Sequence, residues 1–250
     1  MNKLTLKTEV NVLPDRSEMG RVAGMAVEQK IIDLLKEKDE IRMIFAAAPS
    51  QNEVLAYLAA SSTIDWSKIV AFHMDEYIGL SAGAPQLFSE FLNEAIFKKV
   101  PFKQVFRIDG TSNSDDEVIR YSKLLNEAPI DIVCMGIGEN GHIAFNDPPV
   151  ADFNDPAKMK RVELDLACRQ QQVNDGCFPS LDAVPRGALT LTVSALMRGG
   201  HLFCVVPGTT KSEAVYKTLY GPIETQCPAS ILRTHPDCKF YFDRDSYKEL

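Results

Sequence analysis

One histidine and three glycines lie together in residues 136–142, which read GIGENGH. Glycine lets the backbone turn tightly and approach a ligand closely, and histidine is the side chain best suited to exchange a proton near neutral pH. The ring of His142 needs a partner on its second nitrogen to fix its tautomer, and either Asn140 or Asp147 could serve. A glycine-rich loop alone is a weak signal, because an ordinary turn with an incidental histidine has the same composition.

Two adjacent carboxylates, Asp75 and Glu76, follow an apolar run that has the composition of a strand. In isolation, such a pair would be interpreted as a solvated turn. Directly after a buried strand, however, a carboxylate loses contact with water, and its pKa rises toward that of a useful base. Since neighbouring residues at a strand end point in different directions, we expect one of the two to face a ligand and the other to be held structurally.

Two further segments could bind an anion. Residues 207–211 (PGTTK) follow an apolar run and open a helical pattern, so backbone N–H groups and Lys211 could meet a phosphate there. Residues 49–52 (PSQN) occupy the same position after another apolar run, with Ser50 or Asn52 as the helix cap. Either segment could be an ordinary capped helix, but together they indicate the phosphate end of a pocket.

The elements that must position these residues can be predicted from the hydrophobic pattern. Apolar runs predict strands at 41–45, 68–72, 105–108, 131–136, 188–193 and 201–206, and amphipathic stretches predict helices near 18–38, 53–61, 86–98, 115–126 and 211–219. Apolar strands that alternate with helices predict an α/β fold with a single open, mostly parallel sheet and helices on both faces. In such sheets ligands bind beyond the carboxyl ends of the strands, which is where the polar segments would lie.

No repeat or low-complexity linker interrupts the chain, so we expect residues 1–250 to form a single domain. The segment 146–158 is rich in proline and aspartate and predicts a surface loop or lid. Strand-like runs continue beyond it, which argues against a domain boundary at this point.

Composition narrows the classes of partner. The net charge of −7 argues against a nucleic-acid or anionic-membrane surface, although local basic groups could still bind one sugar phosphate. The six cysteines show no C-x-x-C spacing, the first residues lack the apolar core of a signal peptide, and no run approaches a membrane span. We therefore expect a cytoplasmic protein with reduced cysteines. Neither an H-E-x-x-H motif nor a clustered His/Cys/Asp triplet is visible, which argues against a metal.

Four segments resemble the glucosamine-6-phosphate deaminase/isomerase family in order and spacing. They are AFHMDEYIGL (71–80), MGIGENGHIAFNDP (135–148), VPRGALTLTV (184–193) and PGTTKSEAV (207–215). The resemblance extends from about residue 20 to 240. It implies a Rossmann-like fold of the sugar-phosphate isomerase type, no cofactor and a small-molecule aminosugar phosphate as partner, and it leaves a homo-oligomer open.

The resemblance also implies roles for individual residues. Asp75 matches the base that moves a proton between C2 and C1 of the opened sugar, and His142 matches the histidine that handles the ring-oxygen proton. Asn140 and Asp147 stand where the family keeps the groups that orient this histidine, and Lys211 matches a phosphate-binding lysine. The residues expected to bind substrate are Ser50, Gln51, Asn52, Glu76, Gly138, Gly141 and Lys211.

The chain departs from the family pattern at both ends of this site. Many members have an acid where Asn140 stands and a glutamate where Asp147 stands. Because an amide cannot neutralise a protonated imidazole, Asp147 would have to supply more of the negative charge, and from a shorter side chain. A Thr/Ser-Gly-Gly-Thr run is usual where this chain has residues 49–52. The family's phosphate-binding arginine is also missing from its register, and only Arg169 lies nearby. The catalytic end is therefore expected to be retained and the phosphate end remodelled.

These departures keep several functions open. The first is isomerising deamination of glucosamine 6-phosphate to fructose 6-phosphate and ammonia, and a variant is the same chemistry on another aminosugar, such as galactosamine 6-phosphate. A second class is the related 6-phosphogluconolactonase-like hydrolase. A third is a non-catalytic sugar-phosphate sensor, against which the presence of both Asp75 and His142 argues.

Overall fold

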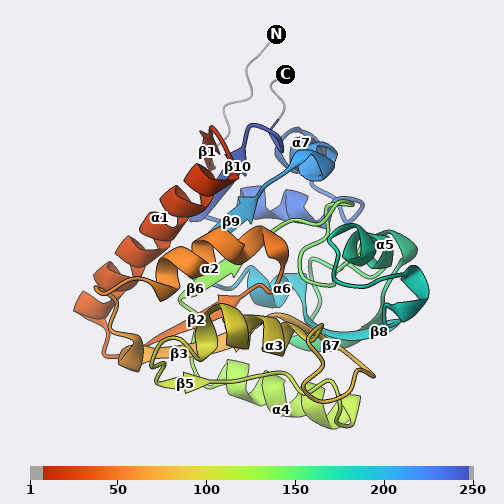
Figure 1. Cartoon of the computed structure of the whole chain (residues 1–250), viewed down its shortest axis with the longest axis horizontal. Coiled ribbons are helices and arrows are strands. Elements are labelled where there is room, and N and C mark those ends of the chain that lie inside the picture. Colours follow the sequence, from red (N-terminus) through yellow and green to blue (C-terminus); the bar gives the residue numbers. More distant parts are fainter. Residues whose placement is uncertain (1–7, 248–250) are drawn as a thin grey trace.

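The computed structural model describes residues 8–247. These residues form two sheets and the helices around them (Figure 1). The strands are β1 (Glu9–Leu13), β2 (Ile41–Phe45), β3 (Ile69–His73), β4 (Asp75–Tyr77), β5 (Gln104–Val105), β6 (Ile132–Met135), β7 (Met159–Glu163), β8 (Gly187–Leu191), β9 (His201–Val206) and β10 (Cys238–Asp243). The α-helices are α1 (Arg16–Glu37), α2 (Asn52–Ala59), α3 (Phe88–Leu92), α4 (Ser114–Asn126), α5 (Leu166–Asn174), α6 (Val193–Leu196) and α7 (Ser212–Tyr220). Short helical turns are η1 (Pro49–Gln51), η2 (Trp66–Lys68), η3 (Asn93–Phe97), η4 (Leu181–Ala183), η5 (Thr209–Lys211) and η6 (Pro228–Thr234).

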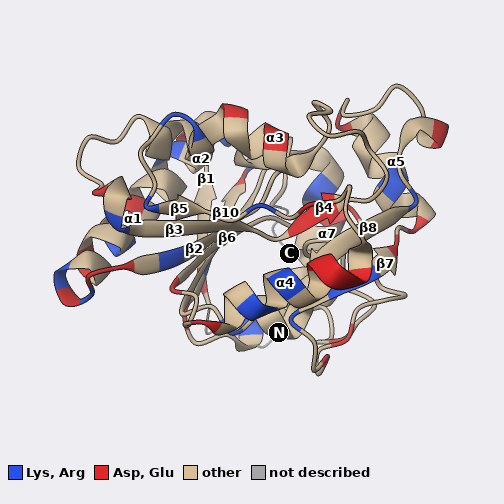
Figure 2. Ribbon diagram, turned by 90° about the horizontal axis from the view of Figure 1, so that it is seen from below, with Lys and Arg blue, Asp and Glu red and all other residues tan. Residues whose placement is uncertain are grey.

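Seven strands form one sheet in the order β1-β10-β9-β6-β2-β3-β5, and all neighbours are parallel. Its central strands β2, β3 and β6 are buried throughout, as expected for a parallel sheet with both faces covered. Figure 2 shows α2 and α3 on one side of these strands and α4 on the other. The predicted α/β fold with helices on both faces of a mostly parallel sheet is confirmed.

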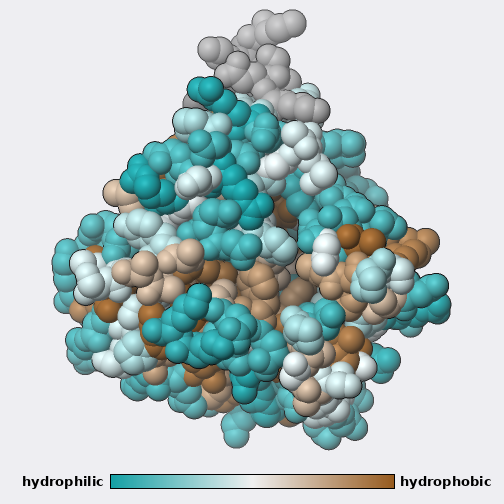
Figure 3. Space-filling view, in the orientation of Figure 1, coloured by the Kyte–Doolittle hydropathy of each residue, from teal (hydrophilic) through white to brown (hydrophobic). Residues whose placement is uncertain are grey.

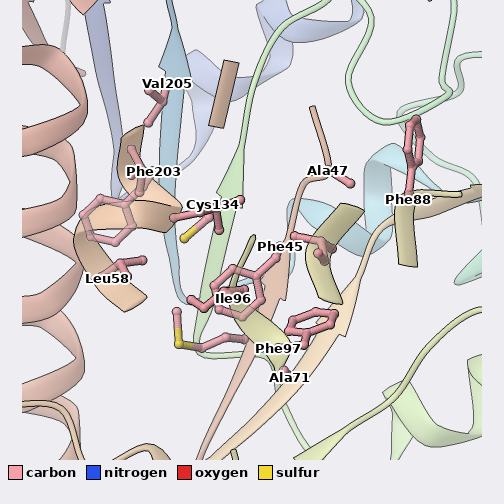
Figure 4. Packing of buried hydrophobic residues seen from close by; sticks show 14 of the residues in the cluster. Phe45, Ala47, Leu58, Ala71, Phe88, Ile96, Phe97, Cys134, Phe203 and Val205 are labelled. Atoms are coloured by element: carbon pink, nitrogen blue, oxygen red, sulfur yellow. The ribbon is translucent and has the colours of Figure 1, made fainter. Parts of the chain in front are cut away.

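Alternate residues of the central strands pack into two separate apolar cores. Phe45, Cys134 and Phe203 face the core beneath α1 and α2, where Phe97 meets the ring of Phe45 at a centroid distance of 5.9 Å (Figure 4). Their neighbours in the strands, such as Ile44, face the other core, which also contains buried residues of α4, α6 and α7. The sheet is thereby fixed from both sides, and its strand ends are held at defined positions.

A second, three-stranded sheet has the order β4-β8-β7 and is antiparallel. It corrects the expectation of a single sheet, because the predicted strand at 188–193 becomes β8 and pairs with β4 and β7 instead of joining the parallel sheet. Residue Asp75 pairs with Thr190 in this small sheet, two residues after β3 ends. The chain therefore leaves one sheet for the other where the acidic pair lies.

Several local signals explain the helices. The Asp15 side chain accepts the N–H of Glu18 and caps α1, and Asn113 caps α4 in the same way. The predicted helix at 86–98 is split into α3 and the π-helical turn η3, and the predicted strand at 105–108 is reduced to the edge strand β5. Segment 146–158 contains no helix or strand, in agreement with the predicted loop. None of the helices within residues 8–247 is long and apolar enough to cross a membrane.

Candidate active site

The carboxyl ends of the central strands surround a cavity of about 460 Å³. From β2 the chain continues to β3 and β5 on one side, and from β6 it continues to β9 and β10 on the other. The cavity lies at this reversal of strand order, where open parallel sheets bind ligands. Its lining includes residues 46–50, 136–138 and parts of 207–211, so the polar strand endings do meet. Figure 3 shows a hollow with apolar residues in the middle of this face.

His142 lines the cavity with one ring nitrogen engaged behind it. Nδ1 lies 2.8 Å from Oδ1 of Asn140 and 3.0 Å from Oδ1 of Asp147. Both partners are acceptors, so Nδ1 carries a proton, and in the neutral ring Nε2 keeps the free lone pair. The Asn140 amide also donates to Asp147 over 2.9 Å, which fixes the direction of its oxygen. Both candidates named for the orienting role thus act together, and the shorter side chain of Asp147 does reach the ring.

His142, Asn140 and Asp147 form a hydrogen-bonded group that we call the relay. The charge of Asp147 determines its electrostatics. Burial acts to raise the pKa of this carboxyl, but its hydrogen bonds with His142 and Asn140 outweigh that effect and hold the pKa below its ordinary value. A carboxylate therefore stands behind the imidazole, 3.0 Å from its Nδ1. This is the charge arrangement that a proton-shuttling histidine needs.

Gly138 leaves room for the histidine ring. A Cβ at this position would lie 2.1 Å from Cε1 and 2.2 Å from Nε2 of His142, so any side chain would push the ring aside. Gly141 has a φ of +85°, which glycine adopts without strain, and it lies outside the cavity lining. The two predicted glycines therefore serve different purposes, one in ring placement and one in the turn.

Asp75 faces the same cavity and receives no hydrogen bond to its carboxylate from residues 8–247. Burial, followed by the nearby charge of Glu76, raises its pKa well above the ordinary value. Its backbone is held by His73, whose Nε2 accepts the N–H of Ile108 at 2.8 Å and whose Nδ1 donates to the Asp75 carbonyl at 2.9 Å. Burial lowers the pKa of His73 to about 3, so this histidine is neutral and rigidly hydrogen-bonded.

Glu76 does not line the cavity, although we expect it from the sequence to bind substrate. It is fully buried, and its carboxylate accepts the backbone N–H groups of Tyr77, Phe88 and Ser89 at 2.8–3.0 Å. These bonds tie β4 to the start of α3. The two carboxylates thus point in different directions, as strand geometry requires, and Glu76 is occupied with holding the site together.

A buried cation lies at the other end of the cavity. The Nζ of Lys211 is buried and has no hydrogen-bond partner among the described residues. Burial lowers its pKa, while the charges of Asp175 and Glu139 act in the opposite direction. The loop that holds it is anchored by Gly208, which has a φ of +93° and donates its N–H to the carboxylate of Asp243 at 3.0 Å. An unpartnered ammonium group of this kind is suited to bind an anion.

In the remodelled segment 49–52, only some of the residues expected to bind substrate line the cavity. Ser50 lines the cavity, but Gln51 is buried beneath it and donates to the carbonyl of Val205 at 3.2 Å. Asn52 opens α2 and lies outside the lining. Of the three predicted ligands in this segment, the structure brings only Ser50 to the cavity surface.

Arg169 is also turned away from the cavity. Its Nη2 donates to the carbonyls of Leu181 and Val184 at 2.6 and 3.1 Å, which fastens α5 to η4. Several residues that the sequence patterns did not single out line the cavity in its place. They come from the start of α1, from α3 and the residues just before it, and from α5 and the residues just after it. Those with polar or ionisable side chains are Arg16, Gln86, Gln171, Gln172, Asp175 and Cys177.

A buried cluster joins Cys168 to the relay. Potential ligand atoms of His142, Asp147 and Cys168 lie within 4.8 Å of one another, so a His/Asp/Cys triplet exists in space although no spacing in the sequence indicates it. Burial and the neighbouring Asp147 raise the thiol pKa of Cys168 well above its ordinary value, and the thiol stays protonated. Because Nδ1 of His142 faces two oxygen acceptors and the Cys168 thiol stays protonated, the donor set fits a hydrogen-bonded relay better than a cation site.

The fold and the site define an α/β protein with a small-molecule cavity at its switch point, lined by a desolvated carboxylate, a hydrogen-bonded histidine and a buried lysine without a hydrogen-bond partner among the described residues. The chain belongs to the family described as glucosamine-6-phosphate isomerases/6-phosphogluconolactonase, whose profile matches residues 14–240. The family resemblance noted in the sequence is thereby confirmed.

Individual relatives agree with this assignment. A glucosamine-6-phosphate deaminase of Lactobacillus delbrueckii subsp. bulgaricus is 32% identical over 239 residues, which is 94% of this chain and 97% of that protein. A glucosamine-6-phosphate deaminase of Listeria monocytogenes is 30% identical over 227 residues, covering 90% of this chain and 95% of that protein. Among solved structures, a monomeric glucosamine-6-phosphate deaminase superposes with a TM-score of 0.86 at 27% identity, over 96% of this chain and 98% of the other. A 6-phosphogluconolactonase from Thermotoga maritima shares the fold, with a TM-score of 0.77 at 21% identity over 95% of this chain and 100% of the other.

Proposed function

We propose that this protein is an aminosugar-phosphate deaminase that converts glucosamine 6-phosphate and water into fructose 6-phosphate and ammonia. The observation that carries the proposal is the pairing of two groups in one cavity: the desolvated Asp75 carboxylate and the His142 ring held by Asn140 and Asp147. Aldose–ketose isomerisation needs both a base for carbon-bound protons and a shuttle for oxygen-bound protons. The names and 30–32% identity of the relatives support the same substrate.

Lys211 and Ser50 would bind the phosphate group of the substrate. The buried ammonium group lacks a protein partner, and a phosphate oxygen would provide the missing acceptor. This contact fixes one end of the sugar, so that its C1 and C2 atoms lie toward Asp75 and His142 at the other end of the cavity. Positioning of this kind supplies a large part of the rate acceleration in proton-transfer enzymes.

His142 would open the sugar ring. Its Nε2 takes the proton of the C1 hydroxyl and delivers a proton to the ring oxygen as the C1–O5 bond breaks, which leaves an open-chain aldehyde. The ring carries both protons between these events, and the Asp147 carboxylate stabilises that cationic form. Asn140 keeps the imidazole in the plane that this transfer requires.

Asp75 would then act on the opened chain. Its carboxylate removes the proton from C2, the electron pair forms a C1–C2 double bond, and the C1 oxygen takes a proton from the C2 ammonium group of the substrate to give an enolamine. Return of the proton to C1 leaves a C2 iminium, which water hydrolyses to the ketone with release of ammonia. The desolvated carboxylate is a stronger base than an ordinary aspartate, in keeping with the weak acidity of a C–H group.

The first experiment is to incubate the protein with glucosamine 6-phosphate and to follow ammonia and fructose 6-phosphate together. Equal amounts of the two products are expected, and Asp75→Asn should slow the formation of both by about 10²- to 10⁴-fold. Hydrolysis of 6-phosphogluconolactone without reaction of the aminosugar would overturn the proposal in favour of the lactonase class. Turnover of galactosamine 6-phosphate at a higher kcat/KM would keep the chemistry and change the substrate. Binding of the sugar phosphates without turnover would indicate a sensor.

The cytoplasmic location, the single domain over residues 1–250 and any homo-oligomer stay predictions. They do not enter the chemistry proposed here.

A further inference from the structure

The phosphate end of the cavity is poor in positive charge. Among the described residues that line the cavity, the lysines and arginines are Lys211 and Arg16, and the acids are Asp75 and Asp175. A phosphate monoester carries a charge of about −1.5 to −2 at neutral pH. One ammonium group, even when fully charged, leaves about a third to a half of this charge without a partner.

Arg169 cannot make up the difference in the observed arrangement. Its Nη2 is committed to two backbone carbonyls, and the residue lies outside the lining. The neighbouring part of α5 presents Gln171 and Gln172 to the cavity instead, and both side chains are neutral. The missing positive charge must therefore come from another element.

Arg16 lies at the start of α1 and reaches the segment that forms the wall of the phosphate end. Its Nη2 donates to the carbonyl of Pro49, in the loop that follows β2, and its Nε lies 2.6 Å from Oε1 of Glu53. A guanidinium group has five N–H donors, so these two bonds hold it in place and leave Nη1 for a ligand. Arg16 also lines the cavity, with a side chain that is 42% exposed.

The packing of α1 on α2 makes this reach possible. A Cβ at Gly20 would lie only 2.1 Å from the Cβ of Glu53, so glycine permits a close approach of the two helices. Arg16 precedes Gly20 by one helical turn and therefore lies on the same face of α1. The close contact brings the guanidinium group beside η1, next to Ser50.

We propose that Arg16 is a second cation of the phosphate site and binds the substrate phosphate opposite Lys211. It takes over, from a different element, the part that the family pattern gives to an arginine before residues 184–193. Glu53 and the Pro49 carbonyl orient the guanidinium group, and its Nη1 donates to the phosphate oxygens. This inference rests on the proposed function for the identity of the sugar, but not for the presence of the anion site.

The test compares Arg16→Gln with two control variants. Arg16→Gln should raise KM for glucosamine 6-phosphate roughly 10- to 100-fold, as expected for loss of one charge-assisted hydrogen bond, with kcat changed less than about threefold. Arg16→Lys should recover part of the affinity. Glu53→Gln removes the charge of the same ion pair but keeps the guanidinium group and leaves an amide oxygen to accept from its Nε, so its KM should rise less than that of Arg16→Gln. Arg21→Gln, on the exposed side of α1 in a pair with Glu18, should change nothing.

Binding measurements keep the outcome independent of turnover. Calorimetry with fructose 6-phosphate and with inorganic phosphate should show the same loss of affinity in Arg16→Gln, and circular dichroism should show an unchanged fold. Equal affinities of the native and Arg16→Gln proteins for both anions would overturn the inference, whether or not glucosamine 6-phosphate is deaminated. An equal loss in Glu53→Gln would also overturn it, because the effect would then come from the broken ion pair. Absence of turnover in the native protein, with the Arg16 effect on binding preserved, would contradict the proposed reaction alone.

Discussion

Replacing Asp75 with asparagine removes the base while keeping the size and shape of the side chain. Asp75 is 94% buried, and its carboxylate accepts no hydrogen bond from residues 8–247. The substitution therefore breaks no internal hydrogen bond of that side chain. It also removes a buried charge beside Glu76, so the fold should not be weakened.

The expected loss of activity follows from the role of a general base. Removing such a group typically lowers kcat by about 10²- to 10⁴-fold, which corresponds to roughly 3–5 kcal/mol of activation free energy. Because the phosphate end is unaffected, KM should stay within about threefold of the native value. The signature is thus a large fall in kcat at nearly constant affinity.

The pH profile of the native protein provides a second readout. The base must be ionised to act, so kcat/KM should fall as the pH drops through the pKa of Asp75. Since burial and Glu76 raise that pKa, the fall should occur well above pH 4, where an ordinary aspartate titrates. In Asp75→Asn this acid limb should disappear from whatever activity remains.

Coupled assays for ammonia and fructose 6-phosphate, read from pH 4 to pH 9, would measure both effects. Asp116→Asn, an exposed position on α4 outside the cavity, is the matched control and should behave as the native protein. Retention of more than about a tenth of the native kcat in Asp75→Asn would refute the assignment of the base. An acid limb centred near pH 4 in the native protein would refute the argument from burial.

Three further predictions concern other parts of the site. Lys211→Ala should raise KM for glucosamine 6-phosphate about 10-fold or more with a smaller change in kcat, measured by steady-state kinetics; an unchanged KM would remove this lysine from the phosphate site. Gly138→Ala should lower kcat by an order of magnitude or more, because the new methyl group would overlap the His142 ring, and a crystal structure should show the ring displaced. Glu76→Gln should lower the free energy of unfolding by about 1–3 kcal/mol in urea titrations, because the amide cannot accept all three backbone N–H groups; an unchanged midpoint would contradict the structural role.

Much of the fold could be predicted from hydrophobic patterns. Strands β2 and β9 match their predicted limits, because uniform apolar runs bounded by polar turns leave little choice of register. The antiparallel strands β4 and β7 were not predicted. Residues 75–77 and 159–163 contain charged side chains, and only tertiary pairing with β8 places them in a sheet. Edge strand β1 was also missed, because only its pairing with β10 places it in a sheet.

The site shows a similar division between local and tertiary information. Residues that follow buried strands, such as Asp75, His142 and Lys211, could be found because a parallel sheet brings its strand ends together. The differing positions of Ser50 and Gln51 could not be predicted, because a single helical turn decides which of the two faces the cavity. Arg16 and Cys168 carry no sequence signal, since each reaches the site through the packing of a helix.

The pairing of the first described strand with the last has a consequence for the order in which this protein folds. Strand β1 pairs with β10, in register from Glu9 with Lys239 to Leu13 with Asp243, so contacts about 230 residues apart complete this edge of the sheet. Asp243 also holds the N–H of Gly208, and β1 leads directly into Arg16. During synthesis the chain emerges from its N-terminal end, and contacts this distant form late. The phosphate end of the cavity should therefore be the last part of the site to form, after the relay at His142, and a chain that ends before Cys238 should be unable to bind a sugar phosphate.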